Sequence, residues 1–170
     1  MAKSDKENRG ARKSDDYYSH WADYAARATA EKHKEHDEIV VAAGITPSGT
    51  VHIGNFREVI TVDLVARALR DRGAKVRFIY SWDDFDVFRK VPAGMPQPEM
   101  LEENLRRSVA DVPDPFGTEE SYAAHHIAAF ESSITSLAIS PEFIRQSKRY
   151  RAGAYAEGIR KALEGRDKIR

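Results

Sequence analysis

In the first half of the chain the pattern of apolar residues changes from that of a strand to that of a helix and back to that of a strand. A β-rich run at 39–43 comes first, apolar residues at helical spacing follow at about 53–72, and a β-branched and aromatic run occupies 76–82. This order predicts a strand at about 38–43, a helix with Gly73 in its C′ position, and a second strand. A crossover of this length implies parallel pairing with a right-handed connection. The helix is expected to pack through one apolar stripe: Ile53, Phe56, Ile60, Leu64 and Ala68.

The N-terminal region divides into a leader and a helix. Residues 1–13 are charged, and we predict that they form a disordered leader. Ser14 is followed by two aspartates, as expected for a helix N-cap with an acidic first turn, and this helix is predicted to end near Lys34. The residues on one side of it are Tyr18, Trp21, Tyr24, Ala25 and Ala28. We interpret this stripe as a surface that packs against the domain rather than as a ligand site.

The second half of the chain is predicted to add helices and one strand. The sequence favours a short helix at 99–110, a longer one at 118–138, a strand at 142–146 and a terminal helix from about Arg151. The third strand would extend the same sheet. The predicted fold class is α/β, with a Rossmann-like parallel sheet preceded by an N-terminal helix, and residues 14–170 would belong to one domain.

Composition narrows the class of protein. The 170 residues include 27 Lys or Arg and 27 Asp or Glu, so a net charge of zero gives no footprint for sequence-independent nucleic-acid binding. Cysteine is absent, which excludes disulfide frameworks and thiolate metal sites. No apolar run approaches the roughly 20 residues of a membrane helix, and the polar start is not a secretory signal. We therefore expect a cytoplasmic protein that does not contact a membrane.

Residues 44–55, Gly-Ile-Thr-Pro-Ser-Gly-Thr-Val-His-Ile-Gly-Asn, form the most specific candidate site. They join the first predicted strand to the first residues of the long helix. A loop of this composition at a helix N-terminus places backbone N–H groups where a phosphate binds well. His52 and Asn55 are three residues apart and fall on one face of the helix. Gly54 between them lets a large ligand approach the backbone.

An acidic stretch follows the second predicted strand: Asp83, Asp84 and Asp86. The carboxyl ends of parallel strands meet at one edge of a sheet, so this stretch and the 44–55 loop should converge on the same crevice. Solvated or capping aspartates would produce the same sequence pattern.

Several motifs, in the same order, resemble the class I, archaeal-type lysyl-tRNA synthetases. The matching motifs are 44–58 with His-Ile-Gly-Asn in place of the HIGH signature, Tyr80-Ser-Trp-Asp-Asp-Phe-Asp86, Lys90-Val-Pro92, Asp111-Val-Pro-Asp-Pro-Phe-Gly117 with Ser121-Tyr-Ala123, and Tyr150-Arg-Ala-Gly153. The similarity runs from about Tyr17 to Arg170. It implies activation of lysine by ATP to lysyl-adenylate and transfer of the lysyl group to tRNA(Lys). Spacing alone indicates only an adenylyl-transferring Rossmann domain.

The resemblance also implies roles for individual residues. The residues assigned to the ATP site are Pro47, Ser48, His52, Gly54 and Asn55. The residues assigned to lysine are Gly44 and Thr46, with Asp83, Asp84 and Asp86 as candidates for binding its ammonium groups. ATP would bring Mg²⁺ with it, and the oligomeric state is left open.

The sequence departs from this family in two places. The second ATP motif of the class, Lys-Met-Ser-Lys-Ser, is absent, so the chain is expected to be an N-terminal portion of the catalytic domain with little or no activity alone. Thr118 and Glu119 stand where many relatives have Cys and His, so no metal site is expected at that corner. His125 and His126 are predicted to be surface residues, because adjacent side chains on a helix point in different directions.

Two other functions fit the same residues. A small nucleotidyltransferase of the HxGH type, acting on a substrate other than tRNA, would share the strand–loop–helix motif. A non-catalytic nucleotide-binding module would share it as well.

Overall fold

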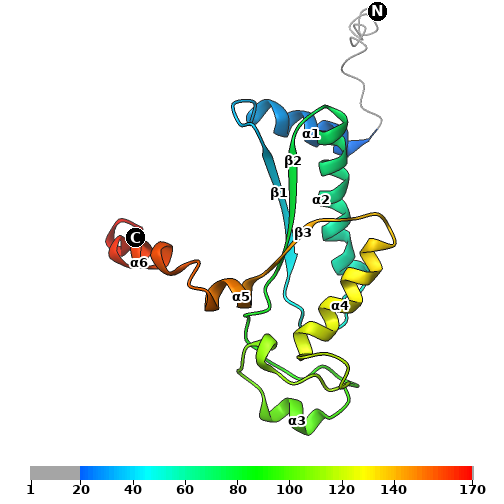
Figure 1. Cartoon of the computed structure of the whole chain (residues 1–170), viewed down its shortest axis with the longest axis vertical. Helices are drawn as coiled ribbons and strands as arrows, with labels where there is room; N and C mark the ends of the chain where they lie inside the picture. The colour runs from blue at the N-terminus through cyan, green and yellow to red at the C-terminus, as the bar shows by residue number, and fades with distance from the viewer. Residues whose placement is uncertain (1–19, 170) are drawn as a thin grey trace, which may run out of the picture.

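The computed structural model describes residues 20–169, which form a three-stranded parallel sheet with helices around it (Figure 1). The strands β1 (Ile39–Ile45), β2 (Val76–Trp82) and β3 (Glu142–Arg145) lie in the order β1-β2-β3. Ile39 is paired with Val76, and Tyr80 is paired with Phe143. The predicted α/β class, the parallel pairing and the place of the third strand in the same sheet are confirmed.

Helices α2 (Ile53–Asp71) and α4 (Tyr122–Thr135) cover one face of the sheet (Figure 1). Every second residue of β2 is buried beneath them, as the period of a strand requires. The core residues shared by this face and the two helices are Ala43, Phe78, Tyr80, Trp82, Val59, Tyr122, Ile127, Phe130 and Ile134. This layer fixes the carboxyl ends of β1 and β2 relative to the start of α2.

The other face of the sheet is more open. Val40 on β1 is 52% exposed, and Arg77 on β2 forms two hydrogen bonds of 2.7 Å with Glu142 on β3. Helices α5 (Gln146–Arg151), α6 (Ala156–Glu164) and α7 (Arg166–Ile169) lead away from the sheet (Figure 1). The terminal helix predicted from about Arg151 is only partly correct, because it begins at Ala156 and is divided at Gly165. Gly153, whose φ of 72° is left-handed, lies between α5 and α6.

Helix α1 (Trp21–Lys32) packs on α2 through alanines rather than aromatic residues. Ala22 and Ala26 are buried, whereas Trp21 and Tyr24 are 49% and 62% exposed, so the predicted packing stripe is wrong. Small side chains allow the two helices to approach closely. His20 caps α1, since its Nδ1 accepts a hydrogen bond from the backbone N–H of Ala22. The predicted leader at 1–13, the N-cap at 14 and the aromatic residue at 18 lie outside the described residues.

Helix α2 agrees well with its prediction. It begins one residue after His52 and ends at Asp71, and Gly73 has the left-handed φ of 81° expected at C′. The predicted apolar stripe is only partly correct. Ile53 is 82% exposed, and the most buried positions of the helix are Val59, Ala66 and Leu69.

The segment between β2 and α4 differs most from its prediction. The helix expected at 99–110 is limited to α3 (Pro98–Glu103), and a 3₁₀ turn (Val109–Asp111) follows. The backbone of Phe88 pairs with Arg106 and Arg107, which removes these residues from a helix, and Arg106 has a φ of 71°. Tertiary backbone pairing thus overrides local helix propensity.

Helix α4 begins at Tyr122, later than predicted, because Ser121 caps it. The Ser121 Oγ accepts a hydrogen bond from the backbone N–H of Ala124. Across residues 20–169, no helix is long and apolar enough to span a membrane.

Candidate functional site

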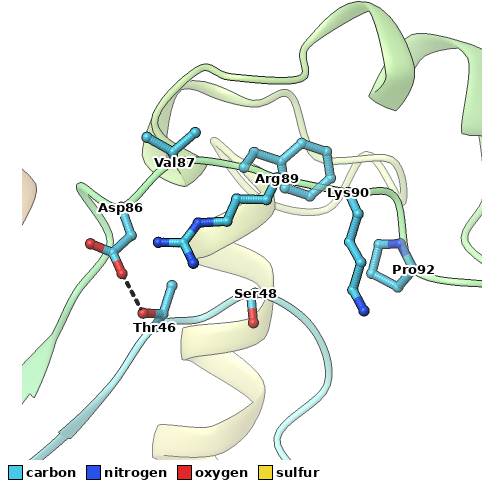
Figure 2. A pocket seen from close by; sticks show the side chains of 8 residues that line it. Thr46, Ser48, Asp86, Val87, Arg89, Lys90 and Pro92 are labelled. Carbon is cyan, nitrogen blue, oxygen red and sulfur yellow. Dashed lines mark hydrogen bonds between the residues drawn. The ribbon is translucent and has the colours of Figure 1, made fainter.

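The loops that follow β1 and β2 meet at the carboxyl edge of the sheet, as expected for a parallel α/β fold. The Thr46 Oγ1 donates a hydrogen bond of 2.7 Å to the Asp86 Oδ2, which joins the two loops directly. They enclose a pocket of about 210 Å³ (Figure 2). Its lining residues are Thr46, Ser48, Asp86, Val87, Phe88, Arg89, Lys90 and Pro92. The predicted convergence of the two polar loops is thus present in the structure.

The loop after β1 is anchored by a buried proline and by hydrogen bonds to its backbone. Pro47 is fully buried, and the backbone N–H of Ser48 donates to the carbonyl of Thr46 at 2.8 Å. The Tyr122 hydroxyl of α4 donates to the carbonyl of Ser48 at 3.0 Å. Burial raises the pKa of Tyr122 to about 12, so this hydroxyl keeps its proton at neutral pH. The Ser48 side chain is left free to line the pocket (Figure 2).

His52 caps the N-terminus of α2. Its Nδ1 accepts a hydrogen bond of 3.1 Å from the backbone N–H of Gly54. A Cβ added to Gly54 would lie 2.9 Å from the His52 Cε1, so any side chain at this position would displace the folded-back imidazole. Asn55 lies on the first turn of α2 and is half-buried. Its side chain forms no hydrogen bond with the other described residues, which leaves its amide available for a ligand.

His52 lines a second, apolar groove rather than the pocket at Thr46. This groove has a volume of about 480 Å³ and lies between the start of α2 and α4. Its apolar and aromatic lining includes Val51, Ile53, Phe56, Phe130 and Leu137. The residues assigned to ATP from the sequence are therefore distributed over two sides of the 46–52 loop, with Ser48 on one side and His52 on the other.

Glu58 contacts the end of β1, which the sequence interpretation did not predict. Its Oε1 accepts a hydrogen bond of 3.2 Å from the backbone N–H of Gly44, at the end of β1. A Cβ added to Gly44 would lie only 2.6 Å from the carbonyl oxygen of Ser81, so the two strands require glycine there. Glu58 lies three residues after Asn55, and this spacing on one helix face was the available signal.

The three candidate aspartates lie in different surroundings. Asp84 is 4% exposed, and its two carboxylate oxygens accept hydrogen bonds of 2.7 Å from the backbone N–H and the hydroxyl of Ser147. Asp83 and Asp86 instead line an open pocket of about 560 Å³ with Phe85, Gln146, Tyr150 and Tyr155. A role in binding lysine stays a prediction for Asp83 and Asp86, whereas the Asp84 carboxylate links β2 to α5.

Replacing Asp84 with alanine is expected to lower the free energy of unfolding by about 3 kcal/mol. The variant would leave the N–H and the hydroxyl of Ser147, which are buried, without their acceptor. Urea denaturation measures this loss. Asp83→Ala is the matched control and should cost less than about 1 kcal/mol, since Asp83 is only partly buried. Equal losses in both variants would contradict the structural role of Asp84.

His125 and His126 are not surface residues, so that prediction is wrong. His126 is 3% exposed and packs against Tyr122 with ring centroids 4.6 Å apart. The His125 side chain is 25% exposed and stacks on Phe116 at 4.1 Å. Both faces of α4 are covered at this point, one by the core and the other by the loop before the helix.

The corner at Thr118 and Glu119 is closed by hydrogen bonds. The Asp114 carboxylate accepts bonds from the backbone N–H groups of Phe116, Thr118 and Glu119. Burial alone would raise the pKa of Asp114, but these hydrogen bonds hold it below its usual value. The Thr118 hydroxyl also contacts the Asp114 carboxylate and lies 3.0 Å from the His125 Nδ1. Among residues 20–169 no group of three or more His, Asp or Glu side chains could hold a metal ion.

The stability of the protein is expected to fall between pH 6.5 and pH 4 because of His126. Burial, reinforced by the nearby charge of His125, lowers the pKa of His126 to about 4. The unfolded chain therefore binds more protons than the folded one in this range, and the folded state loses up to about 3 kcal/mol as the pH falls. His126→Phe should remove most of this loss when denaturation is followed across the range. Replacing the exposed His36 with asparagine should leave it, and an unchanged pH profile in His126→Phe would be inconsistent with a buried neutral imidazole.

Comparison with known proteins identifies the family. The sequence model of the family described as "tRNA synthetases class I (K)" matches residues 19–170. The chain is 51% identical to the lysine--tRNA ligase of Treponema pallidum over 150 residues, which are 88% of the chain and 28% of that relative. It is 53% identical to the lysine--tRNA ligase of Borreliella burgdorferi, over 89% of the chain and 29% of the relative.

The relatives include archaeal proteins as well as spirochaete ones. The lysine--tRNA ligase of Pyrococcus furiosus is 51% identical over 88% of the chain and 28% of its own length. The chain thus spans less than a third of the curated relatives that it matches. Since the family model covers nearly the whole sequence, the chain belongs to the class I tRNA synthetases of the lysine type.

Proposed function

We propose that this chain binds ATP and lysine as part of a class I lysyl-tRNA synthetase. The observation that carries the proposal is that about half of its residues are identical to lysine--tRNA ligases over 88–89% of its length. In the first step, a carboxylate oxygen of lysine attacks the α-phosphorus of ATP. The bond from that phosphorus to the bridging oxygen breaks, and pyrophosphate leaves with the bonding electrons. In the second step a ribose hydroxyl of tRNA(Lys) takes the lysyl group and AMP leaves. Such an enzyme works in the cytoplasm, where these substrates are found.

The geometry supports binding of ATP along the 47–55 loop. Helix α2 is 19 residues long, and its N-terminal N–H groups and dipole favour a phosphate beside His52 and Asn55. Gly54 carries no side chain at this position, and its N–H is bonded to the His52 imidazole. ATP enters as its magnesium complex, so the metal ion belongs to the substrate.

The geometry also supports binding of lysine at the carboxyl ends of β1 and β2. Lysine carries two ammonium groups, and each needs an acceptor when it leaves water. Asp83 and Asp86 lie at this edge, and Glu58 is held against Gly44. Thr46 positions Asp86 through its hydroxyl hydrogen bond. These carboxylates favour lysine, which has two ammonium groups, over a neutral or acidic amino acid.

The proposal is tested by binding of a stable analogue of the intermediate. Lysyl-sulfamoyl-adenosine keeps the adenosine and the lysyl group but cannot react. Isothermal titration of the 170-residue chain should show this analogue binding at least about tenfold more tightly than glutamyl-sulfamoyl-adenosine, because the site has acceptors for ammonium groups.

The other outcomes separate the alternative functions. Tight binding of ATP without a preference for any aminoacyl analogue would favour a nucleotidyltransferase or a nucleotide-binding module. Failure of every adenosine compound to bind would overturn the proposed ATP site itself.

A further inference from the structure

The pocket between the loops after β1 and β2 is lined by charged and polar side chains. The Asp86 carboxylate accepts the hydrogen bond from Thr46 at one end, and the Lys90 side chain extends beside Pro92 at the other (Figure 2). The Arg89 guanidinium extends over the space between Asp86 and Ser48 (Figure 2). The pocket therefore combines one carboxylate, two cations and a hydroxyl.

The two basic side chains have no partner of opposite charge among residues 20–169. Several arginines of the described chain have such partners, namely Arg67, Arg77, Arg145 and Arg151, whereas the exposed Arg57 and Arg70 have none either, so the position of Arg89 and Lys90 on the pocket is what distinguishes them. Two adjacent unpaired cations that line a concave surface repel each other until an anion binds between them. Their placement thus indicates a ligand rather than a contribution to stability.

The backbone that carries these cations is anchored. Phe88 is 2% exposed and its ring lies 5.0 Å from that of Tyr122. The Phe88 N–H and carbonyl form hydrogen bonds of 2.8 Å with the backbone of Arg107 and Arg106. The Tyr122 hydroxyl holds the Ser48 carbonyl on the opposite wall. Because the same tyrosine supports both walls, the distance between the basic residues and Ser48 is fixed by the core.

We propose that Arg89 and Lys90, with the Ser48 hydroxyl, bind the β- and γ-phosphates of ATP and hold them as pyrophosphate when it leaves. This inference rests on the proposed function, and it assigns the two cations of the pocket to one substrate and the Asp86 carboxylate to the other. The pocket that these residues line has a volume of about 210 Å³. When the α-phosphorus–oxygen bond breaks, negative charge accumulates on the departing pyrophosphate, and two cations stabilise that charge most strongly in the transition state.

The test compares phosphate ligands on the 170-residue chain and on Arg89→Gln/Lys90→Gln. Isothermal titration with pyrophosphate, ATP and AMP should show pyrophosphate and ATP binding about tenfold more weakly to the double variant, with AMP unchanged. The matched control is Lys32→Gln/Arg70→Gln, which removes two exposed cations from the last turns of α1 and α2 and should change none of the three affinities. Circular dichroism and the two single variants establish that the double variant is folded.

Two results would overturn the proposal. One is unchanged binding of pyrophosphate and ATP in the folded double variant. The other is a loss confined to a single-stranded RNA ending in CCA, which would assign the two cations to a polynucleotide. Lysyl-sulfamoyl-adenosine has no pyrophosphate, so its affinity should not change in the double variant. If the chain binds pyrophosphate through Arg89 and Lys90 but does not bind this analogue, the phosphate site is supported and the proposed synthetase function is contradicted.

Discussion

Lysine-dependent exchange of pyrophosphate into ATP by the 170-residue chain is expected to stay near background. The sequence contains the His-Ile-Gly-Asn motif but no Lys-Met-Ser-Lys-Ser segment. A mobile cationic loop of that kind contributes several kcal/mol to stabilising the leaving phosphates, which corresponds to a rate at least about 10³-fold higher. Arg89 and Lys90 can hold the leaving group, but they lie on an anchored segment and cannot close over the nucleotide.

The matched control for this measurement is a full-length relative, such as the lysine--tRNA ligase of Pyrococcus furiosus, assayed at the same protein concentration. The analogue titration shows independently whether the 170-residue chain is folded and binds its substrates. An exchange rate within about tenfold of the full-length relative would mean that the catalytic cations all lie within these residues.

The sequence predicted the strand–helix–strand unit closely because each of its signals is local. The strand at 76–82 is found at β2 without any change, and α2 begins after His52 and ends before Gly73 as expected. A strand period of two, a helix period of 3.6 and a C′ glycine all act within a few residues of the chain. The convergence of Thr46 and Asp86 followed from the topology of a parallel sheet rather than from local propensity.

The errors arose where distant residues decide the structure. Residues 106 and 107 leave the predicted helix because their backbone pairs with Phe88, almost 20 positions earlier. Ala22 and Ala26 are buried in place of Trp21 because α1 lies close against α2, and helix contact at short distance selects small residues. Neither effect can be predicted from the sequence of a single helix, because each depends on a contact with another segment.

In the candidate site, too, features set by local sequence were predicted and features set by distant contacts were not. His52, Gly54 and Asn55 were proposed as a candidate site from their spacing in one turn, and this assignment stays a prediction. The separation of His52 from the pocket at Ser48 could not be predicted, because it depends on how α4 and the 86–92 segment pack on the two sides of the loop. Asp84 looked equivalent to its neighbours in sequence, yet Ser147, 63 residues later, occupies its carboxylate.

In a full-length class I enzyme carrying this segment, His52→Ala and Asn55→Ala are each expected to lower the rate of adenylation by about 10²- to 10³-fold. Both residues lie at the N-terminus of α2, beside which the proposed function puts the α-phosphate and its developing charge. An interaction that strengthens in the transition state lowers kcat when it is lost and leaves lysine affinity nearly unchanged. Single-turnover formation of lysyl-adenylate, measured over a range of lysine concentrations, separates the two quantities.

His52 also has a structural role, and His52→Asn separates it from the chemical one. Asparagine is a good N-cap, so this variant keeps a side-chain acceptor for the backbone N–H of Gly54, whereas His52→Ala loses the cap and about 1 kcal/mol of stability. If the imidazole acts on the phosphates, both variants are slow although only His52→Ala is destabilised. Thr61→Ala, an exposed change on the same helix, should alter neither rate nor lysine affinity. Full adenylation activity in His52→Asn would mean that capping of α2 is the only contribution of His52.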